Sequence, residues 1–150
     1  MDSIVVQVAE ALEKIAYAGP FDTTAVVSRS YVARADLEEM NVLHVTIIPI
    51  AWQENDETRD TDSDVITCAM AWQYKVANPE ATEQIDEVMR TFQLNTNRLR
   101  DMTGDDLDGL DAEMIEVEPG ALYDTEQLAT MGVVTSWTSV KVTVPRSRTR

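Results

Sequence analysis

The spacing of apolar residues along the chain predicts two long helices. Residues 3–16 repeat apolar side chains at helical spacing, and Ser3 or Asp2 can cap the start of this helix. Residues 80–100 carry a second apolar stripe directly after Pro79, which favours a helix start. The second stripe consists of Ile85, Val88, Met89, Phe92 and Leu99.

Alternation of apolar and polar positions predicts the strands. They are expected at residues 23–34, 42–53, 65–76, 114–118 and 133–144. The clearest alternation puts one face of a strand at Ile66, Cys68, Met70, Trp72, Tyr74 and Val76. Pro49 cannot donate a ladder hydrogen bond, so its strand is expected to lie at an edge or to contain a bulge there. Short helical turns are expected at residues 36–40 and 124–130, capped by Asp36 and Asp124.

This order of elements, α-β-β-β-α-β-β, predicts an α+β fold. We expect one antiparallel sheet with the two main helices packed on one face. Residues 42–53 and 65–76 are adjacent strands joined by a polar segment, which predicts a long hairpin. Residues 1–144 are expected to form a single domain, and residues 145–150 a basic C-terminal tail.

Composition and charge narrow the functional classes. The chain has 150 residues, is 44% hydrophobic and carries a net charge of −15, from 27 acids against 12 bases. Such a surface repels nucleic-acid phosphates and anionic lipid, so a protein that grips DNA is not expected. There is no apolar run long enough to span a membrane and no basic start typical of a signal peptide. The single cysteine excludes an intrachain disulfide and favours synthesis in a reducing, intracellular compartment.

The most conspicuous candidate for chemistry is the acidic stretch ENDETRDTDSD. Asp60, Asp62 and Asp64 alternate as at the start of a calcium loop. That loop also needs a glycine at its sixth position and a glutamate at its twelfth, and here Val65 and Ala71 stand there. A solvated hairpin tip or an intersubunit charge patch therefore fits better than a cation site.

The remaining reactive residues do not form a recognisable catalytic pattern. His44 is the only histidine, and its neighbourhood in sequence lacks zinc-ligand spacing. Cys68 falls on the apolar face of a strand, which favours a buried thiol. Phosphate-binding, nucleophile-elbow and metalloprotease motifs are missing from the sequence, so we predict neither an enzyme nor a cofactor. The three tryptophans are expected in the core, with an interface as their second place.

Several short motifs occur in an order that resembles a family of bacteriophage proteins. The matching segments are Ser30-Tyr31, Arg34, Asp36–Met40, Val45–Pro49, Ile85–Met89 and Tyr123–Leu128. Together, over about residues 4–144, they resemble the tail-terminator or tail-completion proteins of tailed bacteriophages.

This resemblance implies a structural virion protein of the phage tail or neck, made in the host cytoplasm. Members of the family form a ring, with about six copies, that ends tail-tube growth and joins the tail to the head. The implied partners are other copies of the chain, the tail tube protein, and a head-completion or neck protein. DNA would pass through the ring without being specifically bound, and no membrane is involved.

A ring uses contacts between two different patches, and the charges of this chain offer such a pair. We hypothesise that the acidic hairpin contacts the basic tail of a neighbouring chain or of another neck protein. The residues assigned to this contact are Glu54, Asp56, Glu57, Arg59, Asp60, Asp62, Asp64, Arg146, Arg148 and Arg150. The acidic stretch at residues 101–113 is an alternative site for the same tail.

Three other interpretations remain open from the sequence. A head-side neck adaptor would have the same shape but different neighbours. A small acidic metal-dependent enzyme would use His44 or the aspartates at positions 60, 62 and 64. An acidic binding module would act alone and occupy basic or nucleic-acid-binding proteins.

Overall fold

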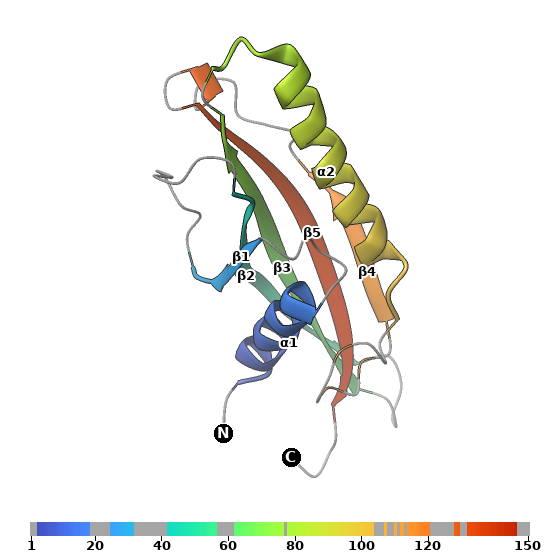
Figure 1. The fold of residues 1–150 in the computed structure, drawn as a ribbon. Coiled ribbons are helices and arrows are strands. Elements are labelled where there is room, and N and C mark those ends of the chain that lie inside the picture. The colour runs from blue at the N-terminus through green and yellow to red at the C-terminus, as the bar shows by residue number, and fades with distance from the viewer. Residues whose placement is uncertain are drawn as a thin grey trace.

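The computed structural model confirms the predicted α+β class and the order of elements (Figure 1). It describes residues 3–18, 25–31, 42–56, 62–76, 78–103, 107, 110, 112, 114–120, 128–129 and 132–146. The elements are α1 (Ile4–Ala18), β1 (Val26–Arg29), β2 (His44–Asp56), β3 (Asp62–Lys75), α2 (Thr82–Arg100), β4 (Met114–Pro119) and β5 (Val133–Arg146). The predicted turn at Asp36–Met40 lies outside the described residues, as does the predicted cap Asp124. Leu128 and Ala129 are helical, as the second predicted turn required.

The strands form one sheet in the order β1-β2-β3-β5-β4. β2 and β3 make the expected long hairpin, and β3 pairs with β5 from Asp62 to Lys75. The expectation of a wholly antiparallel sheet was wrong at one place, because β1 pairs with β2 in parallel. Residues 30–43 connect these two strands, and a connection of that length allows the chain to cross over and re-enter the sheet in the same direction.

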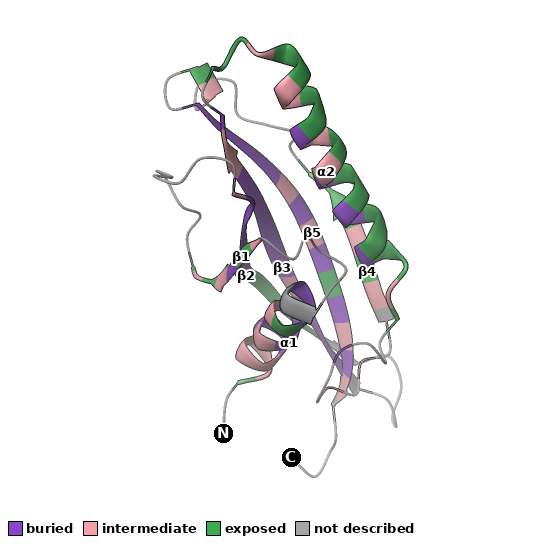
Figure 2. Ribbon diagram, in the orientation of Figure 1, coloured by how far each residue is buried: buried purple, intermediate pink, exposed green. Residues whose placement is uncertain are grey.

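Both helices lie on the same face of the sheet, as predicted (Figure 1). The large core cluster joins Val8 and Leu12 of α1, Phe92 of α2 and the predicted inner face of β3. Figure 2 shows the consequence: β3 and β5 are buried along most of their length, while the outward side of α2 is exposed. Burial of this apolar face, at roughly 25 cal/mol per Å², is the main favourable term in folding.

The helix starts follow from local hydrogen bonds. Ser3 is the cap of α1, because its Oγ accepts a hydrogen bond from the Val6 amide at 3.3 Å. α2 begins at Thr82, two residues later than predicted. The reason is a preceding turn, in which Asn78 Oδ1 accepts the Glu80 amide at 2.9 Å and the Asn78 carbonyl accepts the Ala81 amide.

A buried chain of side-chain hydrogen bonds ties α2 to the sheet. The indole Nε1–H of Trp72 donates to Thr138 Oγ1 at 2.8 Å. The hydroxyls of Thr96 and Thr138 lie 3.2 Å apart and share a further hydrogen bond. Since Trp72 is fully buried, its N–H depends on this threonine in place of water.

Thr138→Val should therefore lower the free energy of unfolding by about 1–3 kcal/mol, because it leaves a buried indole N–H without its acceptor. Urea denaturation followed by circular dichroism measures this. Thr143→Val is the matched control on the same strand, at a partly exposed position, and should change stability by less than about 0.5 kcal/mol. Equal losses in the two variants would contradict the assigned role of Thr138.

Candidate functional site

The outer edge of β2 is covered by β1 over only part of its length. β1 pairs only with His44–Ile47, so β2 continues past it through Ile48–Asp56. Among the residues that the structure describes, no strand pairs with this second stretch on its outer side. An open edge presents unpaired backbone N–H and C=O groups and is a template for pairing with another chain. We call Pro49–Gln53 the free edge.

Pro49 marks the start of this free edge. The register of β2 against β3 shifts between Pro49 and Ala51, so Ile50 is the extra residue of a β-bulge. The prediction of an edge or a bulge at Pro49 is confirmed, and both are present. The bulge places Ile50 on the surface with 58% of its area exposed.

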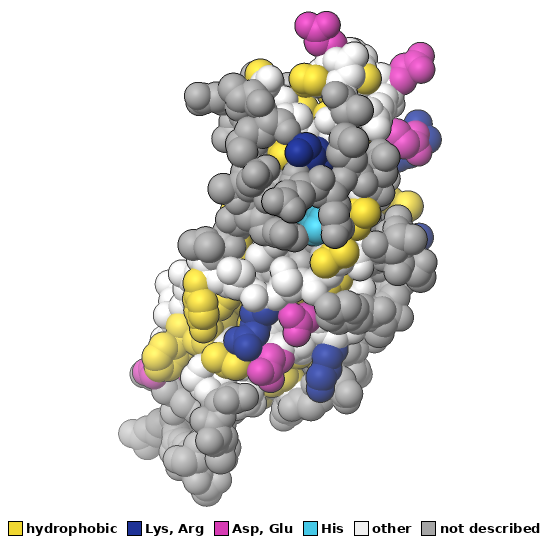
Figure 3. All heavy atoms as spheres, turned by 60° about the vertical axis from the view of Figure 1, so that its left-hand side comes forward, with side chains coloured by type: hydrophobic (Ala, Val, Ile, Leu, Met, Phe, Trp, Pro, Cys, Tyr) yellow, Lys and Arg dark blue, Asp and Glu magenta, His cyan; other side chains and the backbone are white. Residues whose placement is uncertain are grey.

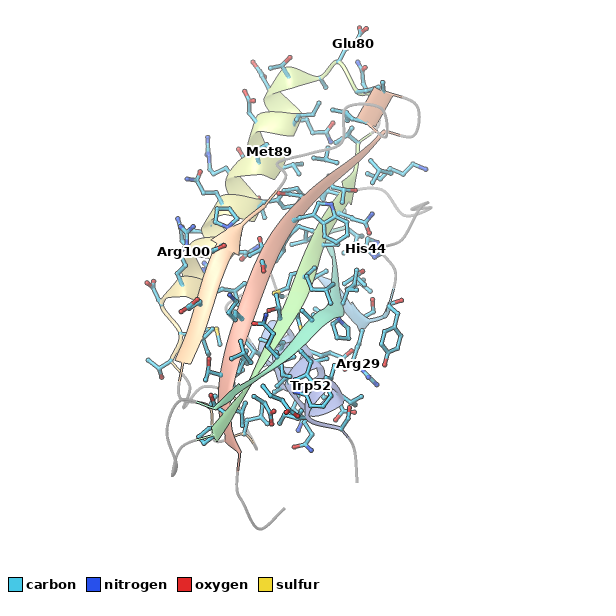
Figure 4. All side chains as sticks on the ribbon, turned by 180° about the vertical axis from the view of Figure 1, so that it is seen from behind. Arg29, His44, Trp52, Glu80, Met89 and Arg100 are labelled. Atoms are coloured by element: carbon cyan, nitrogen blue, oxygen red, sulfur yellow. The ribbon has the colours of Figure 1, made fainter. Side chains whose placement is uncertain are left out.

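Trp52 is the largest exposed side chain of the free edge, with 55% of its area accessible. Its indole Nε1–H donates to Asp64 Oδ1 at 3.1 Å, which fixes the ring against the neighbouring strand. Figure 4 shows Trp52 and Arg100 toward opposite edges of the sheet. Figure 3 shows hydrophobic side chains on the surface of the side that carries β1 and β2. An exposed aromatic ring held in place is typical of an interface residue.

The three tryptophans thus have three different environments. Trp72 is in the core, as expected, and Trp137 packs with Ile48, Ala69 and Ala71 on the other face of the sheet. Trp52 is exposed rather than in the core, which is compatible with the interface position that the sequence left as second choice. The alternating pattern breaks at Pro49, and this break is the signal in the sequence that the following residues face solvent.

The structure describes only part of the predicted charge patch. Glu54 is exposed near the end of β2, whereas Asp64, directly opposite it, is buried and bonded to Trp52. The backbones of Asp56 and Asp62 lie opposite each other in the last pair of the hairpin. Glu57, Arg59, Asp60, Arg148 and Arg150 lie outside the described residues.

The basic end of the chain runs closer to the acidic hairpin than the sequence indicated. β5 continues through Pro145 and Arg146, two residues into the segment predicted as a tail. The register places Arg146 directly opposite Asp62 of the same chain. A basic and an acidic segment are therefore neighbours within one subunit, and the contact between subunits remains a prediction.

The D-x-D-x-D stretch lies in a strand over its described part. Asp62, Asp64 and Val65 belong to β3, as does Ala71, so the positions that a calcium loop needs are in extended backbone. Across the described ranges, no group of three histidine, cysteine or acidic residues is placed to hold a metal ion.

His44 belongs to a buried polar row across the second face of the sheet. Register places His44, Gln73 and Thr135 side by side on β2, β3 and β5, and all three are buried. Gln73 Nε2–H donates to Thr135 Oγ1 at 3.2 Å. The burial and the register of His44 fit its interpretation as a structural strand residue.

A pocket of about 410 Å³ lies between α2 and β5, next to the end of β4. It is lined by Met89, Phe92, Gln93, Thr96, Asn97, Arg100, Pro119, Gly120, Ser136, Trp137 and Thr138. Arg100 donates to Asn97 Oδ1 at 3.3 Å on its rim. The lining contains amides, hydroxyls and one guanidinium but no carboxylate, thiol or imidazole. The lining thus offers hydrogen-bond donors and acceptors together with the apolar side chains of Met89, Phe92 and Trp137.

Comparison with known proteins gives no assignment. No protein-family model matches the chain, and no curated protein matches its sequence. Within the part of the chain that the structure describes, no helix is both long and apolar enough to cross a membrane.

Cys68 provides a test of the buried face of β3. Burial raises the pKa of its thiol to about 12. The native protein should therefore not react with a thiol reagent at pH 8, and unfolding in urea should release one reactive thiol. Because the unfolded thiol ionises near pH 8.5, the free energy of unfolding should also fall as the pH rises above that value. Cys68→Ala should remove this part of the slope, and rapid labelling of the native thiol would contradict its burial.

Proposed function

We propose that this chain is a structural subunit of a phage virion that assembles into a closed ring at the head–tail junction. In this role it ends growth of the tail tube and joins the tail to the head. A head-side neck ring is the variant with the same geometry and different neighbours. The observation that carries the proposal is the free edge of β2, which presents the exposed side chains of Ile50 and Trp52 on an otherwise well-packed sheet.

The sheet is compatible with a ring because its two edges differ. One edge contains the free edge of β2, and the other edge is β4, which lies beside α2. Different surfaces on two sides of a subunit permit a heterologous contact, in which one patch binds a different patch on the next copy. Repetition of such a contact closes a ring when the rotation between copies divides a full turn.

The charge of the chain supports passage of DNA through such a ring without binding. With a net charge of −15, the surface repels phosphates at low salt. We therefore expect duplex DNA to show no measurable association with the purified protein at about 0.15 M salt, where the Debye length is about 8 Å. Tight DNA binding would contradict this part of the proposal.

The proposed function predicts a defined stoichiometry. Quantitative mass spectrometry of purified virions, scaled to the major capsid protein, should give about six or twelve copies per particle. Absence from the particle would remove the proposal. The purified protein should form a discrete oligomer of the same copy number, measured by native mass spectrometry.

The basic end of the chain offers a second test. Deleting residues 147–150 removes Arg148 and Arg150 while keeping all of β5. If these cations bind an acidic patch on a neighbour, the deletion should weaken assembly, and the loss should be largest at low salt, where the ionic contact is least screened. Replacing Ser147 and Thr149 by alanine is the matched control, since it keeps both charges. Wild-type assembly of the truncated chain would show that the tail does not contribute.

A further inference from the structure

The two outer edges of the sheet are complementary to each other. We propose that the free edge of β2 pairs with β4 of a second copy, so that one sheet continues into the next around the oligomer. The inference rests on the proposed ring and names the contact that would build it. Four features of the two strands lead to it: their direction, their position along the strand axis, the orientation of their backbone groups, and their side chains.

Strand direction allows the pairing. β2 is antiparallel to β3, β3 to β5, and β5 to β4, so β4 runs opposite to β2. A rotation about an axis along the strands preserves these directions. It therefore brings β4 of the next copy antiparallel to β2, the arrangement that most neighbours in this sheet already have.

The two strands also lie at the same position along the strand axis. Register places Trp52, Ile66, Val142 and Ile115 in one row across the sheet. A second row contains Ile47 of β2 and Pro119, the last residue of β4. A neighbour's β4 rotated without axial shift would thus start beside the free edge.

The same rows leave room for β1. Ile47, the partner of Arg29, is the last residue of β2 that β1 covers. Pro119 of the neighbour would fall in this same row, so the pairing is restricted to Met114–Val117 of the neighbour's β4, which lie beside Pro49–Gln53 of β2. β1 and this part of β4 would divide the outer side of β2 between them.

Backbone groups on the two edges face outward at matching positions. The Ser30 amide donates to the Ile47 carbonyl, so Ile47 faces the outer side of β2. Alternation through the bulge then turns the N–H and C=O of Trp52 outward as well. On β4, the Gly120 amide donates to the Trp137 carbonyl of β5, so by the same alternation Ile115 faces away from β5. Trp52 and Ile115 stand in the same row and can exchange two backbone hydrogen bonds.

Side chains on the two faces would also be compatible. On the helix-bearing face, exposed Trp52 would lie beside the neighbour's Ile115, which is only partly buried in its own subunit. On the other face, Ala51 would lie opposite Glu116, both exposed in the single chain. Glu54 falls beyond the end of β4, so the pairing puts no two carboxylates directly opposite each other.

Disulfide trapping tests the contact directly. Ala51 and Glu116 would form a pair without mutual hydrogen bonds, with Cα atoms about 4.5 Å apart, which suits a disulfide. Ala51→Cys and Glu116→Cys chains with different tags should, when co-expressed and oxidised, give a cross-linked dimer carrying both tags. Neither variant should cross-link alone. Within one chain the two positions cannot be bridged, because β3 and β5 separate them by about 14 Å.

The control replaces Glu116→Cys by Lys141→Cys, which is exposed in the same row but one strand further from the edge. This pair should not cross-link. Cross-linking of Ala51→Cys chains with one another would indicate pairing of two β2 edges and overturn the inference. A closed oligomer without the mixed cross-link would overturn it while leaving the proposed ring intact. A monomer at all concentrations would overturn both.

A charge on the free edge gives a second readout. Trp52→Lys should shift the oligomer toward monomers by at least tenfold in dissociation constant, because it puts a charge where an aromatic ring would be buried. Leu94→Lys is the matched control, since Leu94 is 50% exposed and belongs to α2 rather than to an edge strand. Circular dichroism confirms that both variants fold. Equal effects on assembly, or none from Trp52→Lys, would contradict the proposed contact.

Discussion

The pairing of β3 along both of its sides is the constraint on which the rest of the structure depends. β3 has β2 on one side and β5 on the other over nearly all of its length, so its backbone groups are satisfied by the sheet alone. Its two faces then have separate roles. The face with Trp72 builds the core under both helices, and the face with Ala71 and Gln73 carries small and polar residues.

The sequence was sufficient to predict this centre of the fold. The alternation from Ile66 to Val76 gave the correct inner face, and the apolar stripe of α2 gave the correct buried side. Both patterns are dense, and each is produced by burial against a single surface. The parallel pairing of β1 could not be predicted, because a short strand reads the same in either direction. Its orientation depends on the path of the connection that follows it.

The candidate site was only partly predictable, for a related reason. Pro49 marked an edge or bulge, and the structure has both. Whether Trp52 faced solvent or core depended on which part of the helix-bearing face is covered, and this is decided by packing between segments distant in sequence. The predicted acidic patch shows the opposite problem. Charge alone did not separate exposed Glu54 from buried Asp64, which accepts a hydrogen bond from Trp52.

The position of β5 has a consequence for the order of folding. β2 and β3 are neighbours in sequence and can form their hairpin at a low entropic cost, whereas β5 joins β3 only after α2 and β4 have been passed along the chain. β4 pairs solely with β5 among the strands described, so its edge has no support until this late, long-range step is complete. A growing oligomer that needs both edges would then accept only fully folded subunits.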